Sequence, residues 1–195
     1  MRIGIIGAGM IGSTMAKLWA AAGHTVMIAS RHPDELAPLV EKLGRNTSAG
    51  AAVDAAAFGE AILLTVPLGA LPQLATDLAP TLAGKVVLDT GNAYEKRDGA
   101  VAREASQHPG GSAGWAAALF PGARWVKAFN TVYFKVLERE AHRGGDRVGI
   151  PLASDDRSAL DVAVELVRDA GFEPDTPPYN TGMSATDLRP LFIRR

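Results

Sequence analysis

The sequence predicts an α/β protein, a doubly wound and mostly parallel sheet with helices on both faces and a small C-terminal extension. Short apolar runs alternate with longer amphipathic stretches rich in Ala, a rhythm typical of parallel strands joined by helices. The first apolar run is followed by a G-x-G-x-x-G motif that opens a helix, an arrangement of the Rossmann type. The apolar run at residues 61–66 does not alternate, as expected of a strand buried on both faces.

The other apolar runs place the remaining strands. In chain order, and including the run just described, we expect strands at residues 2–6, 25–29, 61–66, 85–89, 124–128, 147–153 and 172–174.

Helix signals fill most of the segments between these strands. A helix at residues 10–22 ends at Gly23, which can serve as its C-terminal cap. A second helix at residues 33–42 has Pro33 at its first position and two acidic residues in its first turn, where carboxylates suit the helix dipole. Further helices are expected at residues 49–57, 68–78, 131–140, 156–170 and 184–192.

Two segments carry turn signals instead. Residues 94–114 are polar and rich in Gly, which predicts a long surface loop, and residues 175–182 predict ordered coil. From the length of 195 residues we expect one main domain of the Rossmann type over residues 1–153. A small α/β extension over residues 154–195 would pack on that same domain.

Composition and charge exclude several classes of function. Cys is absent, so disulfides and metal sites held by Cys are excluded. Lys and Arg number 20 against 21 Asp and Glu, and this net charge of −1 argues against binding to nucleic-acid backbones. No apolar run approaches the roughly 20 residues of a membrane span. We therefore expect a cytoplasmic protein with a small-molecule partner, no metal site, and a homodimer as the candidate assembly.

The glycine motif predicts a site for the pyrophosphate of a dinucleotide. Gly7 allows the tight turn off the strand, Gly9 leaves room for the pyrophosphate, and Gly12 lets the helix pack on the sheet. The first N–H groups of the helix are free to bind phosphate. The alternative is a turn that packs strand on helix without a ligand. The expected contacts with the cofactor are Gly7, Ala8, Gly9, Met10, Ile11 and Gly12.

The end of the second strand favours NADP(H) over NAD. An NAD site usually carries Asp or Glu there, to bind the ribose hydroxyls. This chain has Ser30 and Arg31 instead, which can bind a 2′-phosphate by a hydrogen bond and a charge-assisted bond. The alternative is that both residues only cap the next helix.

Several further motifs resemble one family. They are the opening at residues 1–12, Ala-Ser-Arg at 29–31, Leu-Thr-Val-Pro at 64–67, Val-Lys-Ala-Phe-Asn-Thr at 126–131, and residues 152–156. On these motifs, over nearly its whole length, the chain resembles the deazaflavin-dependent NADP oxidoreductases, which are linked to coenzyme F-420. The same type of domain is similar to the reductase portion of the membrane ferric reductases of the six-transmembrane class.

The resemblance implies where NADP(H) lies. It would cross the carboxyl ends of the strands, with Thr65, Val66 and Pro67 along its ribose and pyrophosphate. Ala128 and Asn130 would lie near the nicotinamide, and Asn130 would orient the carboxamide.

The resemblance also implies a second redox ligand. Coenzyme F-420, or a flavin such as FMN or FAD, would stack on the nicotinamide. Its pocket would draw on the loop after Asp89 and on residues 180–191.

Hydride transfer between two stacked rings requires proximity and orientation rather than a nucleophile. In agreement, no side chain is predicted to be catalytic, and the four His residues lack the spacing of metal ligands. Lys127 either contacts a phosphate or is a charge on an edge strand of the sheet. Asp156, with its neighbour Asp155, is expected to cap a helix.

Two other functions fit the sequence. One is a small NADPH-dependent reductase of an imine or carbonyl, which requires a proton donor. The other is a non-catalytic NADP(H)-sensing protein, which requires no catalytic group.

Overall fold

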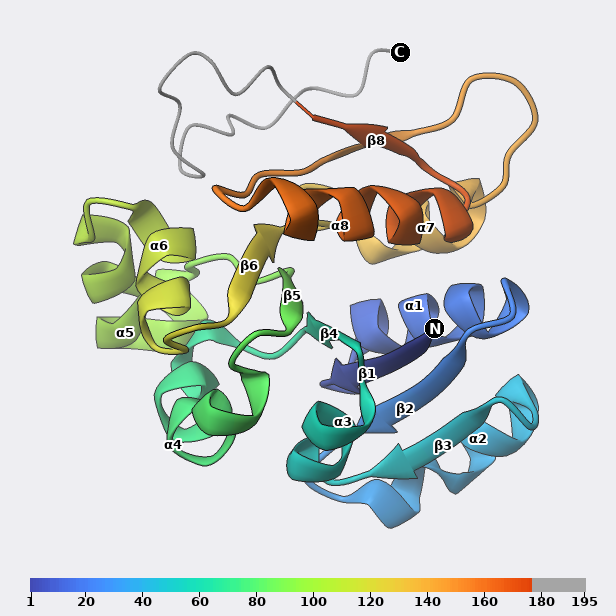
Figure 1. Cartoon of the computed structure of the whole chain (residues 1–195), viewed down its shortest axis with the longest axis horizontal. Coiled ribbons are helices and arrows are strands. Elements are labelled where there is room, and N and C mark those ends of the chain that lie inside the picture. The colour runs from blue at the N-terminus through green and yellow to red at the C-terminus, as the bar shows by residue number, and fades with distance from the viewer. Residues whose placement is uncertain (177–195) are drawn as a thin grey trace.

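A six-stranded parallel sheet with helices on both faces forms the centre of the computed structural model, which describes residues 1–176 (Figure 1). The strand order is β3-β2-β1-β4-β5-β6, the order of the Rossmann fold. The predicted fold class is therefore confirmed.

The strands of this sheet are all parallel to their neighbours, so their carboxyl ends meet at one edge. We call this the carboxyl edge. The strands are β1 (Arg2–Ile6), β2 (Thr25–Ala29), β3 (Thr47–Gly50), β4 (Ala61–Leu64), β5 (Val86–Asp89) and β6 (Arg124–Lys127).

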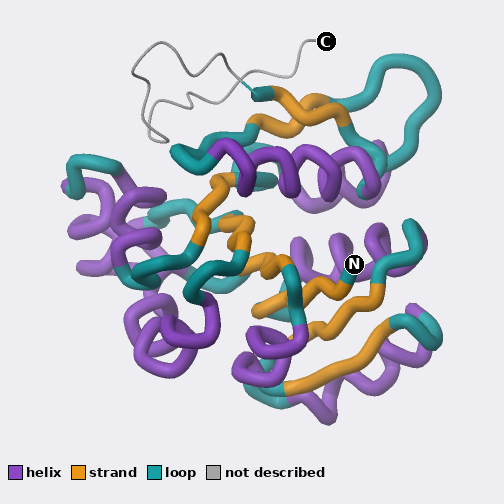
Figure 2. The backbone as a smooth tube through the Cα atoms, viewed as in Figure 1, coloured by secondary structure: helices purple, strands orange, loops and turns teal. Residues whose placement is uncertain are grey.

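The helices form two layers, one on each face of the sheet (Figure 2). Successive side chains of a strand point to opposite faces, so each face has its own apolar core for helices to cover. Ile3 and Ile5 of β1 lie in a core with α1, α7 and α8, whereas Ile6 lies in a second core with α3, α4, α5 and α6. The helices are α1 (Met10–Ala21), α2 (Ala37–Leu43), α3 (Ala52–Phe58), α4 (Leu71–Leu82), α5 (Glu95–Gln107), α6 (Gly111–Ala118), α7 (Phe134–Glu140) and α8 (Arg157–Asp169). Short 3-10 turns, η1 (Pro33–Leu36) and η2 (Leu68–Ala70), precede α2 and α4.

A second, two-stranded sheet follows the first. It consists of β7 (Gly149–Pro151) and β8 (Glu173–Asp175), which are parallel. An isolated bridge between Lys127 and Ala153 connects it to β6. The buried Trp19 indole of α1 donates a hydrogen bond to the Leu166 carbonyl of α8 at 2.8 Å, which ties the first helix to the last.

The prediction for residues 49–57 is wrong at its start. These residues were expected to form one helix, but residues 47–50 form β3 and the helix begins at Ala52. The segment T-S-A-G has no apolar run. It forms an edge strand of the sheet because it pairs with β2. Tertiary pairing here outweighs local propensity.

The surface loop predicted for residues 94–114 is also wrong, because this segment and its continuation form α5 and α6. The loop was predicted from the polar residues and glycines of this segment; one of these, Gly99, has φ 58° and ψ −127° and kinks α5 without ending it. The two helices are held by small buried side chains such as Ala102, Ala105 and Ala116, together with Trp115. The predicted helix at residues 184–192, and the pocket contribution from residues 180–191, lie outside the described residues.

None of the helices described within residues 1–176 has the length and apolar character of a membrane span.

At the start of α8, Asp156 is the N-cap, and its carboxylate accepts a hydrogen bond from the Ala159 N–H at 2.9 Å. This confirms the predicted cap. The same carboxylate forms a two-pronged ion pair with the Arg124 guanidinium of β6, with distances of 2.7 and 3.2 Å. The hydrogen bond from Arg124, followed by the one from Ala159, holds the pKa of Asp156 well below its usual range.

Asp156→Asn is expected to lower the free energy of unfolding at neutral pH. A lowered folded-state pKa adds stability above the unfolded pKa of about 3.9, and that stability is lost as pH falls. The difference between wild type and variant, from denaturant unfolding at several pH values, should therefore shrink below about pH 4. Asp155→Asn is the matched control, because the exposed Asp155 should leave the profile unchanged. An Asp156→Asn effect that is constant down to pH 2 would contradict the prediction.

Candidate dinucleotide site

The residues predicted to bind the cofactor form a row along the carboxyl edge. One backbone hydrogen bond crosses each of four pairs of neighbouring strands just beyond the strand ends, so the loops after β1, β4, β5 and β6 are held side by side. These bonds run from Gly7 to Ala29, from Thr65 to Ile6, from Thr90 to Leu64 and from Ala128 to Asp89, at 2.9–3.1 Å. The structure thus brings together residues that lie more than 120 positions apart in the chain.

Gly7 and Gly12 are required by the fold itself. Gly7 has a φ of 114°, and a Cβ there would lie 2.3 Å from the Thr65 carbonyl oxygen. A Cβ on Gly12 would lie 2.0 Å from the Gly7 carbonyl oxygen. These two glycines therefore let α1 pack against β1 and β4, as the motif predicts.

Gly9 is different, because nothing in the fold requires a glycine there. It is the N-cap of α1 with φ −73°, and a Cβ would meet no atom within 4 Å. The space beside Gly9 is open, and Met10 next to it is 65% exposed. A ligand that lies against this backbone explains the glycine, and the start of α1 faces the same open space. Ala8 and Ile11 are half-buried behind it.

Carboxylates occupy the helix starts after β2, β3, β4 and β5 along this edge, although α7 after β6 has none. Asp34 and Glu35 lie in the first turn of η1, Asp54 accepts a hydrogen bond from the backbone at the start of α3, and Asp98 accepts one from the Gly69 N–H in η2. The first turn of α5 is also acidic. Carboxylates compete with phosphate for such N–H groups. Among the first helical segments described after β1 to β5, only α1 has no carboxylate at its start, since the start of η2 has Asp98 of α5.

Ser30 and Arg31 follow β2 directly, one residue beyond the Ala29 carbonyl that binds Gly7. The Ser30 hydroxyl accepts a hydrogen bond from the His32 N–H at 3.0 Å, which forms a local turn. His32, and not Ser30 or Arg31, is the N-cap of η1, and no side chain caps that turn. The hydroxyl proton of Ser30 and the exposed Arg31 are therefore available to a ligand.

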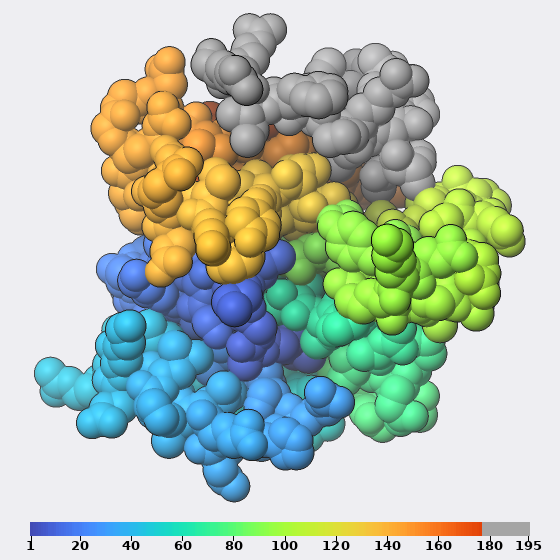
Figure 3. Space-filling view, turned by 180° about the vertical axis from the view of Figure 1, so that it is seen from behind, coloured from blue at the N-terminus to red at the C-terminus, as the bar shows by residue number. Residues whose placement is uncertain are grey.

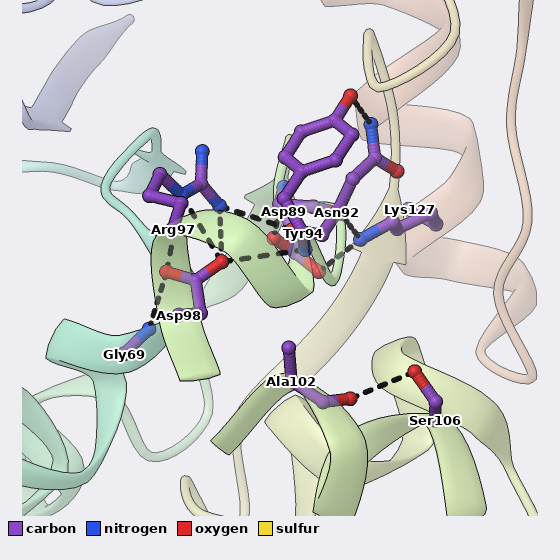
Figure 4. A network of polar contacts seen from close by, with 10 residues as sticks. Gly69, Asp89, Asn92, Tyr94, Arg97, Asp98, Ala102, Ser106 and Lys127 are labelled. Atoms are coloured by element: carbon purple, nitrogen blue, oxygen red, sulfur yellow. Dashed lines mark hydrogen bonds and ion pairs between the residues drawn. The ribbon is translucent and has the colours of Figure 1, made fainter. Parts of the chain in front are cut away.

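Thr65, Val66 and Pro67 follow β4, and η2 begins immediately after them. Asp98 of α5 fixes this loop, since its carboxylate is 1% exposed and accepts the Gly69 N–H at 3.1 Å. Burial raises the pKa of Asp98, but hydrogen bonds from Arg97, Gly69 and Tyr94 outweigh burial and lower the pKa overall. The loop after β4 is thus tied to the helix after β5 by an ionised carboxylate (Figure 4).

Lys127 is the charge on an edge strand that one of its two predicted roles gave it, since it lies on β6 at the end of the strand order, but it is buried and paired. Its ammonium is 4% exposed and lies 2.7 Å from the Asp89 carboxylate, whose side chain is 2% exposed. It also donates to the Gly91 carbonyl, while the other Asp89 oxygen accepts the Gly91 N–H at 2.7 Å. The ion pair therefore holds the turn after β5 against the end of β6. Sequence reasoning missed it because the two residues lie on different strands.

Asn130 lies at the end of this row, just beyond β6 and Ala128. Its side-chain nitrogen donates to Asn92 Oδ1 at 3.2 Å, and Asn92 Nδ2 donates to the Asn130 carbonyl at 2.7 Å. Asn130 Oδ1 is buried, and no described residue donates to it. Phe129, between Ala128 and Asn130, is fully buried with a φ of 58°, a conformation that is rare for a bulky side chain.

These loops border a recess in the surface. Seen from behind, the blue segment of α1, the gold segment after β6 and the yellow-green segment of α5 surround it (Figure 3). Tyr94 and Tyr133, which begin the segments after β5 and β6, are 54% and 60% exposed. The candidate site therefore has an open, uncapped helix start at α1 and an amide-lined, aromatic end after β5 and β6.

Residues 2–93 match the family model described as NADP oxidoreductase coenzyme F420-dependent. The F420-dependent NADP reductase of Methanothermobacter thermautotrophicus is 32% identical over 177 residues, which cover 85% of this chain and 75% of that protein. The chain belongs to the F420-dependent NADP oxidoreductase family. The predicted NADP-binding oxidoreductase is thereby confirmed.

Two other similarities extend beyond the region matched by the family model. The rat protein Metalloreductase STEAP3 is 31% identical over 173 residues, which cover 89% of this chain but only 33% of that protein. The chain thus spans about a third of this relative's length. The crystal structure of the hypothetical protein SMa0349 from Sinorhizobium meliloti has a TM-score of 0.77 and 30% identity, and covers 90% of this chain and 83% of that one.

The two kinds of glycine in the motif should respond differently to substitution. Gly12→Ala is expected to cost about 1–3 kcal/mol of stability, because its Cβ would collide with backbone. Gly9→Val should cost no more than about 1 kcal/mol, as a weaker N-cap. It should nevertheless abolish NADPH binding, measured by titration calorimetry. Full NADPH affinity in Gly9→Val would show that the pyrophosphate does not lie against this backbone.

Proposed function

We propose that this member of the family transfers a hydride between NADP(H) and a second planar redox cofactor, a deazaflavin of the F-420 type or a flavin. The observation that supports it best is the row of contacts along the carboxyl edge, which suits an extended dinucleotide. The described residues 1–176 contain no group of three or more side chains placed to hold a metal ion. The site offers binding and orientation instead.

The residues present fit NADP(H) at three points. The open backbone at Gly9 and the free start of α1 would hold the pyrophosphate. Ser30 and the exposed Arg31 would bind the 2′-phosphate. Asn130 Oδ1, a buried acceptor without a donor, would bind the carboxamide of the nicotinamide.

When bound, NADPH supplies a hydride from its nicotinamide ring. The protein's part is then to hold that ring and its acceptor at about 3 to 3.5 Å in the correct orientation. The amides of Asn92 and Asn130 would fix one edge of the nicotinamide. The exposed rings of Tyr94 and Tyr133 would border the acceptor and exclude water from one side. A homodimer and a cytoplasmic location stay predictions.

The activity is tested by mixing the protein with NADPH and following absorbance at 340 nm. Oxidation is expected with coenzyme F-420 or a flavin present, and not with simple imines or carbonyls. Oxidation with an imine or carbonyl alone would favour the small reductase instead. NADPH binding without oxidation by any of these acceptors would favour a sensor.

Arg31→Glu should weaken NADPH binding far more than NADH binding. The change removes a charge-assisted bond to the 2′-phosphate worth about 1.5–3 kcal/mol, or roughly 10- to 150-fold in affinity, and adds repulsion. The matched control is Arg45→Glu, the same change of charge at an exposed position just before β3, at the opposite edge of the sheet. If titration shows equal losses for both nucleotides in Arg31→Glu, Arg31 does not bind the 2′-phosphate.

A further inference from the structure

We propose that Asn92 fixes the orientation of the Asn130 amide, so that the site selects a nicotinamide by the N–H donor of its carboxamide. Asn92 is then a positioning residue, and the pair determines specificity at the reactive ring. This inference rests on the proposed function, which places the nicotinamide beside Asn130.

The orientation of the Asn92 amide is set from its nitrogen. Asn92 Nδ2 donates to the Asn130 backbone carbonyl at 2.7 Å and to the Tyr94 hydroxyl at 3.2 Å. A carbonyl oxygen only accepts hydrogen bonds, so the Asn92 nitrogen must face it. The remaining atom, Asn92 Oδ1, is thereby directed at the Asn130 side chain. Figure 4 shows Asn92 beside the Tyr94 ring.

The orientation of Asn130 follows from that of Asn92. Asn92 Oδ1 accepts hydrogen bonds only, so the group that meets it at 3.2 Å must be the Asn130 nitrogen. This leaves Asn130 Oδ1 on the far side of its amide, buried and without a donor among the described residues. An unpaired buried acceptor is unfavourable, and a ligand donor that reaches it would restore the missing hydrogen bond.

The backbone around Asn92 is held firmly enough to maintain this orientation. The preceding Gly91 is fixed on both sides by the Asp89–Lys127 pair. The Asn92 carbonyl accepts a hydrogen bond from the Arg97 guanidinium at 3.0 Å. Arg97 is itself paired with the buried Asp98 carboxylate at 2.7 Å. Ion pairs therefore flank the turn that carries Asn92.

The predicted selectivity has a definite sign. A carboxamide offers an N–H to Asn130 Oδ1. An acetyl group has the same carbonyl but a methyl in place of the N–H₂, and a carboxylate offers only negative oxygens. Because the Asn130 amide is held with Oδ1 toward the ligand, neither group finds a donor there. Nucleotides with an acetyl or a carboxylate group should therefore bind more weakly than those with a carboxamide.

The wild-type protein provides the first test, by titration of NADP⁺, its 3-acetylpyridine analogue and its nicotinic acid analogue. We expect both analogues to bind roughly 10- to 100-fold more weakly than NADP⁺, because each leaves the buried acceptor unpaired. Equal affinity for all three would overturn the inference while leaving NADP binding intact. Failure of all three to bind would instead count against the proposed function.

Asn92→Ala provides the second test. Without Asn92 Oδ1 the Asn130 amide can turn over and present its nitrogen, so the ratio of affinities for NADP⁺ and the 3-acetylpyridine analogue should fall to within about threefold of one. Ser106→Ala is the control, since it removes one side-chain hydrogen bond within α5, to the Ala102 carbonyl at 2.7 Å, and should keep the wild-type ratio.

A general loosening of the fold would weaken both nucleotides together and leave their ratio unchanged. An unchanged ratio in Asn92→Ala would therefore overturn the role of Asn92. If thermal unfolding shows that Asn92→Ala does not fold, Asn92→Ser replaces it. The serine side chain is too short to accept the hydrogen bond from Asn130 Nδ2, so this variant tests the same contact. The wild-type ratio decides the orientation of Asn130 in either case.

Discussion

The buried ion pair between Lys127 and Asp89 is the contact on which the arrangement of the loops after β5 and β6 depends, and these loops form the proposed nicotinamide end of the site. Two opposite charges, each almost fully withdrawn from water, are compensated by one another and by the backbone of Gly91. Removing one member of such a pair typically costs about 3–5 kcal/mol, since the other is left charged and unpaired. The loops after β5 and β6 are therefore held in one arrangement. This arrangement fixes the positions of Asn92 and Asn130, whose side chains face each other between the two loops.

Along the rest of the carboxyl edge, carboxylates occupy several of the helix starts that could bind an anion. A Rossmann sheet presents several helix starts along one edge, and each could attract an anion. In this chain carboxylates satisfy or neutralise the starts after β2, β3, β4 and β5, whereas the start after β1 stays free. In the proposed arrangement, Asp54 and Asp98 would exclude the pyrophosphate from the starts of α3 and η2, in addition to what the glycines of the motif contribute. This arrangement also explains why a chain with a net charge of −1 can bind a highly anionic nucleotide.

How much of this could be predicted from sequence depended on how local the cause was. β1, α1 and β2 follow from an apolar run, a glycine motif and a second run, and their bounds were predicted to within a residue. β3 could not be predicted, since its four residues become a strand only by pairing with β2. α5 and α6 were hidden by Gly99 and by a core of Ala side chains, whose burial depends on the opposite layer.

For the candidate site, the structure bears only on which predicted residues lie together. The motif residues and those after β2 and β4 belong to contiguous patterns and lie together on the carboxyl edge. Asn92 and Asp98 were missed, because their roles depend on partners 38 and 29 residues away. Spacing along the chain contains no signal for contacts of this kind.

The left-handed backbone at Phe129 restricts which residues can replace Phe129 and the aromatic rings that pack against it. Its ring is set edge-on to Trp19 of α1 and to Phe172 before β8, with centroids 6.2 and 6.4 Å apart. Glycine would suit that backbone but leave a void, whereas Val or Ile would fill the core but resist the positive φ. The three rings must therefore change together, so a chimera that exchanges the α8–β8 segment with a relative would have to carry its partners on α1 and after β6.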